Sequence, residues 1–118
     1  MIDTHAHICD PAFDDDRNEV LERAADAGIT VVIAVGEDLA DARKNIDLAA
    51  DHPVLRPAAV LYPTILDQAR AAEMHGFIRK ERAGIVAVGE VGMDFWIVKE
   101  ESDKELQKEI FRGFITLA

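Results

Sequence analysis

The stretch Ile29-Thr30-Val31-Val32-Ile33-Ala34-Val35 is apolar at almost every position and shows no alternation between apolar and polar residues. Such a run is typical of a strand buried on both faces of a parallel sheet. Three further strands are expected at Met1 to His5, at about Arg56 to Leu61 and at Ile85 to Gly89. Because proline lacks the N–H that a central strand donates, we expect the third strand to begin after Pro57. The sequence thus predicts a parallel sheet of four strands.

Amphipathic stretches with helical periodicity follow each of these strands. The first helix runs through Val20 to Ala25 and stops at Gly28, and the second has Asp38 as its expected N-cap. Thr64 begins a Thr-x-x-Asp spacing that marks the start of the third helix, and Ser102 to Glu105 form a capping box for the fourth. This alternation is typical of an α/β fold built from parallel β-α units.

The number of β-α units sets the expected domain organisation. A complete TIM-type (β/α)8 barrel takes about 250 residues, whereas this chain has 118. We therefore expect residues 1–118 to form a single partial domain of four β-α units, half of such a barrel. An open sheet of this kind leaves its outer strands with free edges and an apolar concave face. The missing half, a second copy or a flatter rearrangement of the fold would cover them.

Composition narrows the functional classes. The chain is 49% hydrophobic and 31% charged, a globular balance, and its net charge of −10 opposes broad binding to duplex DNA. A small contact with an anionic substrate through bound metal ions stays open. No apolar run approaches the roughly 20 residues of a membrane span and no secretory signal is evident, so we expect a cytoplasmic protein. Cys9 is the only cysteine, so no intramolecular disulfide forms, and we interpret it as a packing residue.

Two short motifs carry the candidate chemistry. His5 and His7 lie two residues apart in an expected strand, so their imidazoles point to the same face, and Glu90 follows the fourth strand in Gly89-Glu90-Val91-Gly92-Met93-Asp94. Taken singly, the first motif is equally well explained by hydrogen-bonded strand histidines and the second by a polar, glycine-rich loop. Because both lie at carboxyl ends of parallel strands, where functional residues gather, together they predict a metal site.

The other titratable residues have simpler interpretations. His52 and His75 are interpreted as surface histidines. Asp10 and the run Asp14 to Asp16 would be able to approach a metal from the first loop, but helix N-terminal charge and solvation explain them without it.

The combination of motifs resembles one family, the TatD metal-dependent deoxyribonucleases. The matching features run through the whole chain: Ile2-Asp3-Thr4-His5-Ala6-His7-Ile8, Phe13, Gly28-Ile29, Val88 to Asp94, Gln107-x-x-x-Phe111 and Leu117-Ala118. The resemblance implies the N-terminal half of a (β/α)8 barrel with two divalent ions (Mg, Mn or Zn). It also implies hydrolysis of phosphodiester bonds in DNA, often from a 3′ end, with single-stranded DNA or another phosphodiester as substrate.

The resemblance also implies roles for individual residues. His5 and His7 would be ligands of one metal, Glu90 would bridge both ions, and Asp94 would support the loop. The family's remaining ligands, two later histidines and a late aspartate, are expected beyond Ala118. The chain departs from the family at Tyr62-Pro63, where Gly-x-His-Pro is common, so a substrate contact from that histidine is missing and the tyrosine hydroxyl is a possible replacement.

The expected function is therefore that of a metal-dependent hydrolase, a deoxyribonuclease whose isolated N-terminal portion is inactive or weak. No catalytic base is assigned among the 118 residues. Two alternatives stay open: a non-catalytic half-barrel module that pairs with a partner chain or with itself, and an amidohydrolase-like enzyme acting on a small amide or ester.

Overall fold

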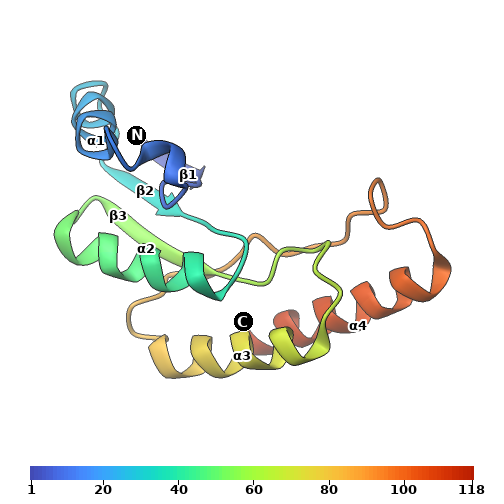
Figure 1. Ribbon diagram of the computed structural model, residues 1–118. Coiled ribbons are helices and arrows are strands. Elements are labelled where there is room, and N and C mark those ends of the chain that lie inside the picture. The colour runs from blue at the N-terminus through green and yellow to red at the C-terminus, as the bar shows by residue number, and fades with distance from the viewer.

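The computed structural model describes residues 1–118 and consists of alternating strands and helices. The strands are β1 (Ile2–Ala6), β2 (Val31–Ala34), β3 (Leu55–Ala59) and β4 (Ala87–Val88). The helices are the 3-10 helix η1 (Pro11–Phe13) and the α-helices α1 (Arg17–Asp26), α2 (Leu39–Asp51), α3 (Gln68–Glu81) and α4 (Glu101–Leu117). All strand pairs are parallel, in the order β1-β2-β3-β4. Figure 1 labels the first three of these strands. The predicted succession of parallel β-α units is confirmed.

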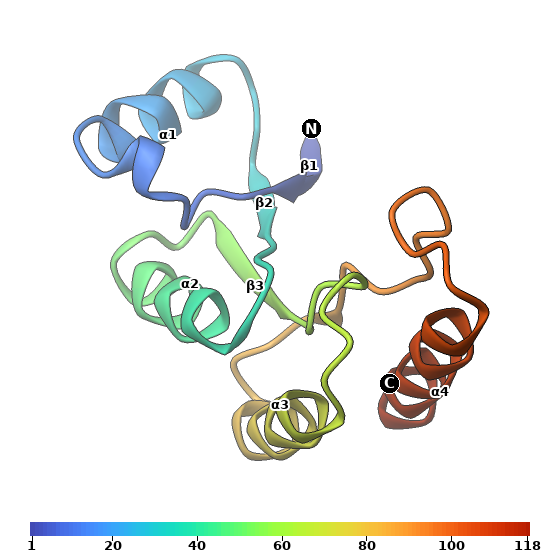
Figure 2. The ribbon, with the colours of Figure 1, turned by 45° about the vertical axis from the view of Figure 1, so that its right-hand side comes forward.

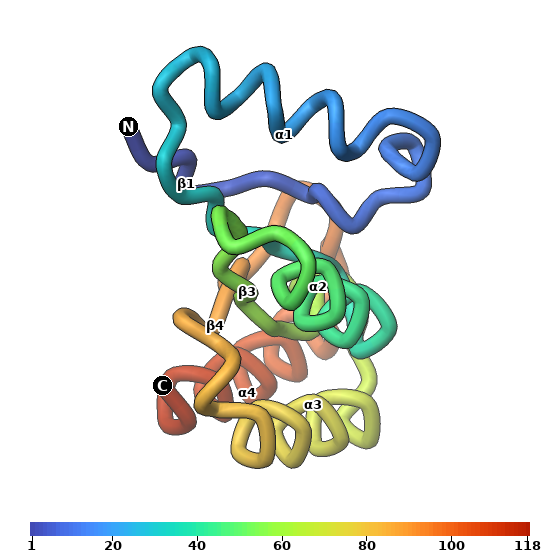
Figure 3. Tube along the Cα trace, turned by 90° about the vertical axis from the view of Figure 1, so that its left-hand side faces the viewer, coloured from blue at the N-terminus to red at the C-terminus, as the bar shows by residue number.

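The helices follow the strand order around the molecule. Figure 2 shows them along an arc outside the strands, and Figure 3 shows α1 at one end of the molecule and α3 with α4 at the other. The Cα radius of gyration is 15.1 Å, larger than the value of about 13.5 Å expected for a closed domain of this length. The four units therefore form an open half-barrel.

Two apolar clusters hold the helices against the strands. One packs α1 against the first strands through Ile8, Leu21, Val32, Ala34 and Leu55. The other joins α2, α3 and α4 to the end of β3 through Ala42, Ala59, Val60, Leu61, Ala71, Met74, Ile78 and Phe114. The outer strands lack such cover, since Ile2 in β1 is 57% exposed and Val86 beside β4 is 54% exposed. None of the α-helices has both the length and the apolar character that crossing a membrane requires.

The structure corrects the expected start of the third strand. β3 begins at Leu55, two residues before Pro57, although β3 lies between β2 and β4. The Pro57 carbonyl accepts a hydrogen bond from the Val86 N–H on the β4 side. In a parallel sheet the N–H and C=O of one residue point toward the same neighbouring strand. The side on which Pro57 lacks an N–H is therefore the side of the segment before β4. Proline is tolerated here because no ladder bond is lost.

The observed ends of the helices agree only in part with those predicted from the sequence. The Asp38 carboxylate accepts hydrogen bonds from the Ala40 and Asp41 N–H groups, which confirms the predicted cap of α2. Gly28, just past α1, has a φ of +88°, as the predicted stop requires. The prediction for α3 was wrong: its cap is Asp67, not Thr64, because Thr64 lies in a turn that the Ile65 N–H closes on Tyr62.

The predicted capping box of α4 was also wrong. The Lys104 N–H already donates to the Glu100 carbonyl, so the helix starts two residues earlier than a Ser102 cap allows. Glu101 and Asp103 occupy the first turn instead, where carboxylates interact favourably with the helix dipole.

His75 lies in α3 with its ring against α4, and it is partly buried rather than the surface residue that the sequence predicted. Its ring packs edge-on against Phe114, with centroids 4.5 Å apart, and its Nε2 is buried without a hydrogen-bond partner. Desolvation, with a smaller effect of the nearby Arg79 charge, lowers the pKa of His75 below its ordinary value of 6.5. The unfolded chain therefore binds a proton at this residue more readily than the folded chain does.

We expect the stability contributed by neutral His75 to be fully present above about pH 6.5 and to decrease as the pH falls below that value. Urea unfolding measured from neutral to mildly acidic pH checks this expectation. The variant His75→Gln should lose less stability over the same interval than the wild type. Equal losses in the two proteins would show that His75 does not contribute to the acid sensitivity.

Candidate metal centre

The carboxyl ends of the two outer strands bring three donor side chains together. His5 lies in β1, His7 follows its last residue, and Glu90 lies two residues past β4. In a flat sheet, strands separated by three spacings would be about 14 Å apart. Instead His5 Nε2 is 3.4 Å from Glu90 Oε2, and His7 Nε2 is 3.3 Å from Glu90 Oε1. Curvature of the strands therefore lets opposite edges of the sheet share one site.

The donor set fits a divalent cation. One nitrogen from each histidine and one carboxylate oxygen all lie within 4.8 Å of one another. Tetrahedral bonds of about 2.1 Å would place neighbouring donors about 3.4 Å apart. The separations of 3.4 and 3.3 Å from His5 and His7 are close to this value, and each involves a different carboxylate oxygen of Glu90. Imidazole nitrogen with carboxylate oxygen suits Zn, Mn or Fe. The three side chains are therefore grouped closely enough to hold one ion.

The site is open to solvent. The side chains of His5, His7 and Glu90 are 49%, 34% and 31% exposed. No other His, Cys, Asp or Glu side chain joins this cluster. Three donors leave a coordination position free for water or substrate, which is the arrangement of catalytic rather than structural zinc sites.

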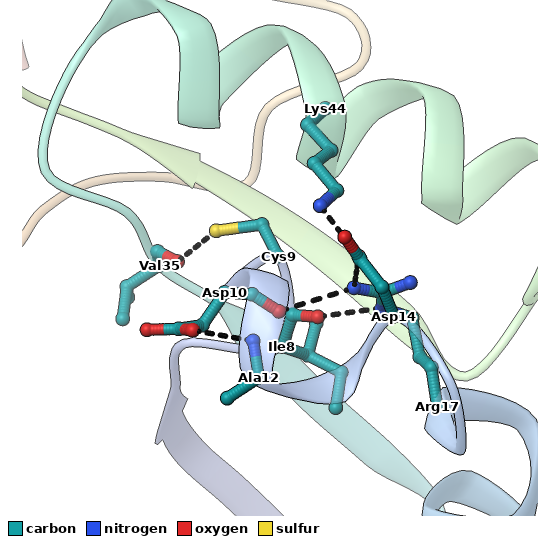
Figure 4. A network of polar contacts seen from close by, with 8 residues as sticks. All are labelled: Ile8, Cys9, Asp10, Ala12, Asp14, Arg17, Val35 and Lys44. Atoms are coloured by element: carbon teal, nitrogen blue, oxygen red, sulfur yellow. Dashed lines mark hydrogen bonds and ion pairs between the residues drawn. The ribbon is translucent and has the colours of Figure 1, made fainter.

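A polar network shapes the loop that follows His7 (Figure 4). The Arg17 guanidinium donates to the Ile8 and Asp10 carbonyls and pairs with Asp14, whose carboxylate also accepts from Lys44 at 2.8 Å. These bonds, to Lys44 first and Arg17 second, lower the pKa of Asp14. Asp10 thus caps η1, Asp14 and Asp16 form ion pairs, and none of the acidic residues of the first loop joins the metal cluster.

Cys9 is part of the same loop and is buried, as predicted. Its thiol contacts the Val35 carbonyl at 3.5 Å. Burial, with a further contribution from Asp41, raises the pKa of Cys9 to about 11. The thiol therefore stays protonated and contributes packing rather than a thiolate ligand.

A buried glutamine anchors the loop that carries Glu90. Gln107 in α4 is 1% exposed; its Oε1 accepts the Asp94 N–H at 3.0 Å, and its Nε2 donates to the Pro63 carbonyl at 2.8 Å. Gln107 therefore links the loops after β3 and β4. Sequence reasoning quoted Gln107 only as part of a family pattern. Its position at helical spacing from the apolar Phe111 and Phe114 was a signal that its amide is buried.

Asp94 and Tyr62 lie in the loops after β4 and β3 and do not join the metal cluster. The Asp94 carboxylate accepts the N–H groups of Trp96 and Ile97 at 2.9 and 3.0 Å, so it shapes the loop as the resemblance implied. The Tyr62 N–H donates to the Glu37 carbonyl at 2.7 Å, which ties the loops after β2 and β3 together.

Comparison with known proteins identifies the family to which the chain belongs. The family profile described as TatD related DNase matches residues 2–118. The chain belongs to the TatD family. A TatD-family structure, that of the TatD homolog YJJV from Escherichia coli K12, superposes on all of this chain with a TM-score of 0.85 at 28% identity, and 46% of that chain is covered. The half-barrel fold expected from the sequence is thereby confirmed.

Curated TatD relatives are similar along the whole chain. An uncharacterized metal-dependent hydrolase, YabD of Bacillus subtilis, is 30% identical over 121 residues, covering 100% of this chain and 46% of the relative. The 3′-5′ ssDNA/RNA exonuclease TatD of Erwinia tasmaniensis is 28% identical over 121 residues, with the same coverage of 100% and 46%. The chain thus spans about half the length of the curated relatives it matches.

Proposed function

We propose that this TatD-family chain is part of a metal-dependent hydrolase that cleaves phosphodiester bonds in DNA, with His5, His7 and Glu90 as ligands of a divalent ion. In this proposal residues 1–118 are one partial domain, and a second ion takes its remaining ligands from the other half of the barrel. The observation that carries the proposal is the convergence of the three donors from opposite edges of the sheet, with spacings of 3.3 and 3.4 Å. The relatives named as metal-dependent hydrolases and as a DNA and RNA exonuclease support it.

In this proposal His5, His7 and Glu90 have different roles in binding the ion and admitting the substrate. Glu90 faces a different histidine with each carboxylate oxygen, so it orients both imidazoles and supplies negative charge against a dication. When bound, a divalent ion polarises a phosphoryl oxygen and lowers the pKa of a water molecule toward neutrality. The half-exposed side chains leave space for a phosphate to approach in an otherwise acidic protein.

The chain offers no general base at this site, because the nearby Asp94 carboxylate is already occupied by two loop N–H groups. We therefore expect the isolated chain to hydrolyse slowly. The same cluster would also serve hydrolysis of a small amide or ester, so the substrate has to be tested directly.

Hydrolysis of a short end-labelled single-stranded DNA, with Mg²⁺ or Mn²⁺ added, tests the proposal. We expect slow cleavage that depends on the metal and is lost in the double variant His5→Ala, His7→Ala. Amide and ester substrates are assayed in parallel. Cleavage unchanged by the double substitution would remove the metal mechanism. Hydrolysis restricted to the amide or ester would replace the DNA assignment, and no hydrolysis of any substrate together with no binding of Mn²⁺ would favour a non-catalytic half-barrel module.

A further inference from the structure

The loop between β4 and α4 exposes an unusual set of apolar side chains. Residues 91–97 contain five of the nine large hydrophobic side chains that are exposed in the whole chain: Val91 (37%), Met93 (46%), Phe95 (43%), Trp96 (82%) and Ile97 (60%). This is the loop that begins with Glu90. In Figures 1 and 2 it is the orange segment that stands clear of the helices before α4. Clustered exposed apolar residues of this kind mark contact surfaces.

Lysines accompany the two exposed aromatic rings. Lys99 Nζ lies 5.0 Å from the centre of the Trp96 ring, and the ammonium groups of Lys104 and Lys108 lie 5.8 and 5.9 Å from the centre of the Phe95 ring. Lys99 also donates to the Phe95 carbonyl at 3.2 Å and has no carboxylate within 4.0 Å. Aromatic faces beside cations are what proteins use to bind single-stranded nucleic acids.

The loop is held in shape by hydrogen bonds and not by its aromatic rings. The Asp94 carboxylate accepts from Trp96 and Ile97, the Asp94 carbonyl accepts from Val98, and Gln107 accepts the Asp94 N–H. Val98 is the buried residue of the segment, at 6% exposure. Trp96 contributes little to this packing, and its ring stays 82% exposed although Lys99 lies over it. Another molecule can therefore contact the ring at a small ordering cost.

The distance to the metal cluster and the local charge select the kind of molecule. Trp96 is six residues from Glu90, so the two residues lie no more than about 20 Å apart. A stack of about six nucleotides spans this distance. Carboxylates of Glu101 and Glu105 pair with Lys104 and Lys108 at 3.2 and 2.6 Å and reduce the positive charge available to phosphates. Base stacking needs no such charge, so this surface favours unpaired bases over a duplex.

We propose that Phe95, Trp96 and Lys99 form a base-stacking platform, on which unpaired bases of a single-stranded nucleic acid rest while its backbone runs toward the Glu90 cluster. This inference rests on the proposed phosphodiester hydrolysis and specifies how the substrate is held. The rings supply the affinity, and Lys99 supplies one phosphate contact. Binding should therefore depend only weakly on salt concentration.

The single tryptophan of the chain makes the platform directly observable. The protein is titrated with an oligodeoxythymidine of about 12 nucleotides in the presence of a chelator, and Trp96 emission is followed. We expect saturable quenching by the single strand, by the matching oligouridine as well, and none by the same DNA in a duplex. Absence of quenching by both single strands would overturn the proposal, as would equal quenching by the duplex.

Variants of the loop distinguish base stacking from nonspecific hydrophobic contact. In fluorescence anisotropy with a labelled oligodeoxythymidine, Trp96→Ala should weaken binding about 10-fold, whereas Trp96→Phe keeps a ring and should bind within about threefold of the wild type. Ile97→Ala, which changes a non-aromatic neighbour that is 60% exposed, is the matched control and should bind normally. Equal weakening by Trp96→Ala and Ile97→Ala, together with loss of self-association in light scattering, would identify the loop as a protein contact.

The result is distinguishable from that of the hydrolysis assay. Binding is measured with the metal removed, so quenching that persists in the variant His5→Ala, His7→Ala supports the platform whatever the outcome for cleavage. Metal-dependent cleavage combined with normal oligonucleotide binding by Trp96→Ala would refute the platform and leave the proposed function standing.

Discussion

The double variant His5→Ala, His7→Ala should bind Mn²⁺ at least about 100-fold more weakly than the wild type. Loss of a group that merely orients a ligand costs about 10–100-fold in metal affinity, and this variant loses two of the three donors of the cluster. The remaining Glu90 carboxylate, 31% exposed, would bind an ion no better than other surface carboxylates. Glu90→Gln should give a similar loss, because it removes the charge while leaving the shape unchanged.

Isothermal titration with Mn²⁺, at a pH above the ordinary histidine pKa of about 6.5, measures this effect. His52→Ala is the matched control: it also removes an imidazole, but from outside the cluster, and should leave the affinity unchanged. Retention of wild-type affinity by the double variant would show that the three side chains meet without forming a metal centre.

The variant Gln107→Leu should lower the free energy of unfolding by about 2–4 kcal/mol. Leucine fills a similar volume but leaves the Asp94 N–H and the Pro63 carbonyl without their partners at 3.0 and 2.8 Å. An unsatisfied buried polar group costs about 1–3 kcal/mol. Since Asp94 lies in the same loop as Glu90, this loop should also become less ordered, and Mn²⁺ affinity should fall by about 10-fold or more.

Urea unfolding and Mn²⁺ titration check both parts of the prediction. Gln68→Leu is a matched control, because the Gln68 side-chain amide also donates a hydrogen bond to a distant segment, to Glu109 in α4 at 2.9 Å, but Gln68 is exposed. This control substitution should change the free energy of unfolding by no more than about 0.5 kcal/mol. If Gln107→Leu behaves like Gln68→Leu, the buried amide does not anchor the loop.

Local patterns in the sequence were reliable where the interaction itself is local. The Asp38 cap, the Gly28 stop and the strand at β2 depend on residues that are neighbours in the chain, and all three were predicted. The expected burial of β2 on both faces was wrong, because Val31 and Ile33 are only partly buried on the open face of the half-barrel. Thr64 and Ser102 offered equally plausible caps, yet Asp67 and Glu100 take those positions. The choice between nearby caps depends on where the preceding turn ends, which local spacing does not specify.

In the candidate site, too, some features follow from the local sequence and others depend on the tertiary structure. The residue types and the spacing of His5 with His7 determined that two imidazoles share one face of a strand, and the position of Glu90 after the last strand placed it at the same edge. The order of strands and the parallel direction also follow from the sequence pattern, through the alternation of strands and helices.

Only the tertiary structure decided that these groups meet. An alternating pattern does not state how far a sheet bends, and without that curvature the outer strands would be about 14 Å apart instead of holding donors 3.3 and 3.4 Å apart. The burial of Gln107 and of the His75 Nε2 atom and the exposure of Trp96 were likewise decided by helix packing. Each depends on which surfaces remain after distant segments have packed together, and this is a property of the assembled chain rather than of any local stretch.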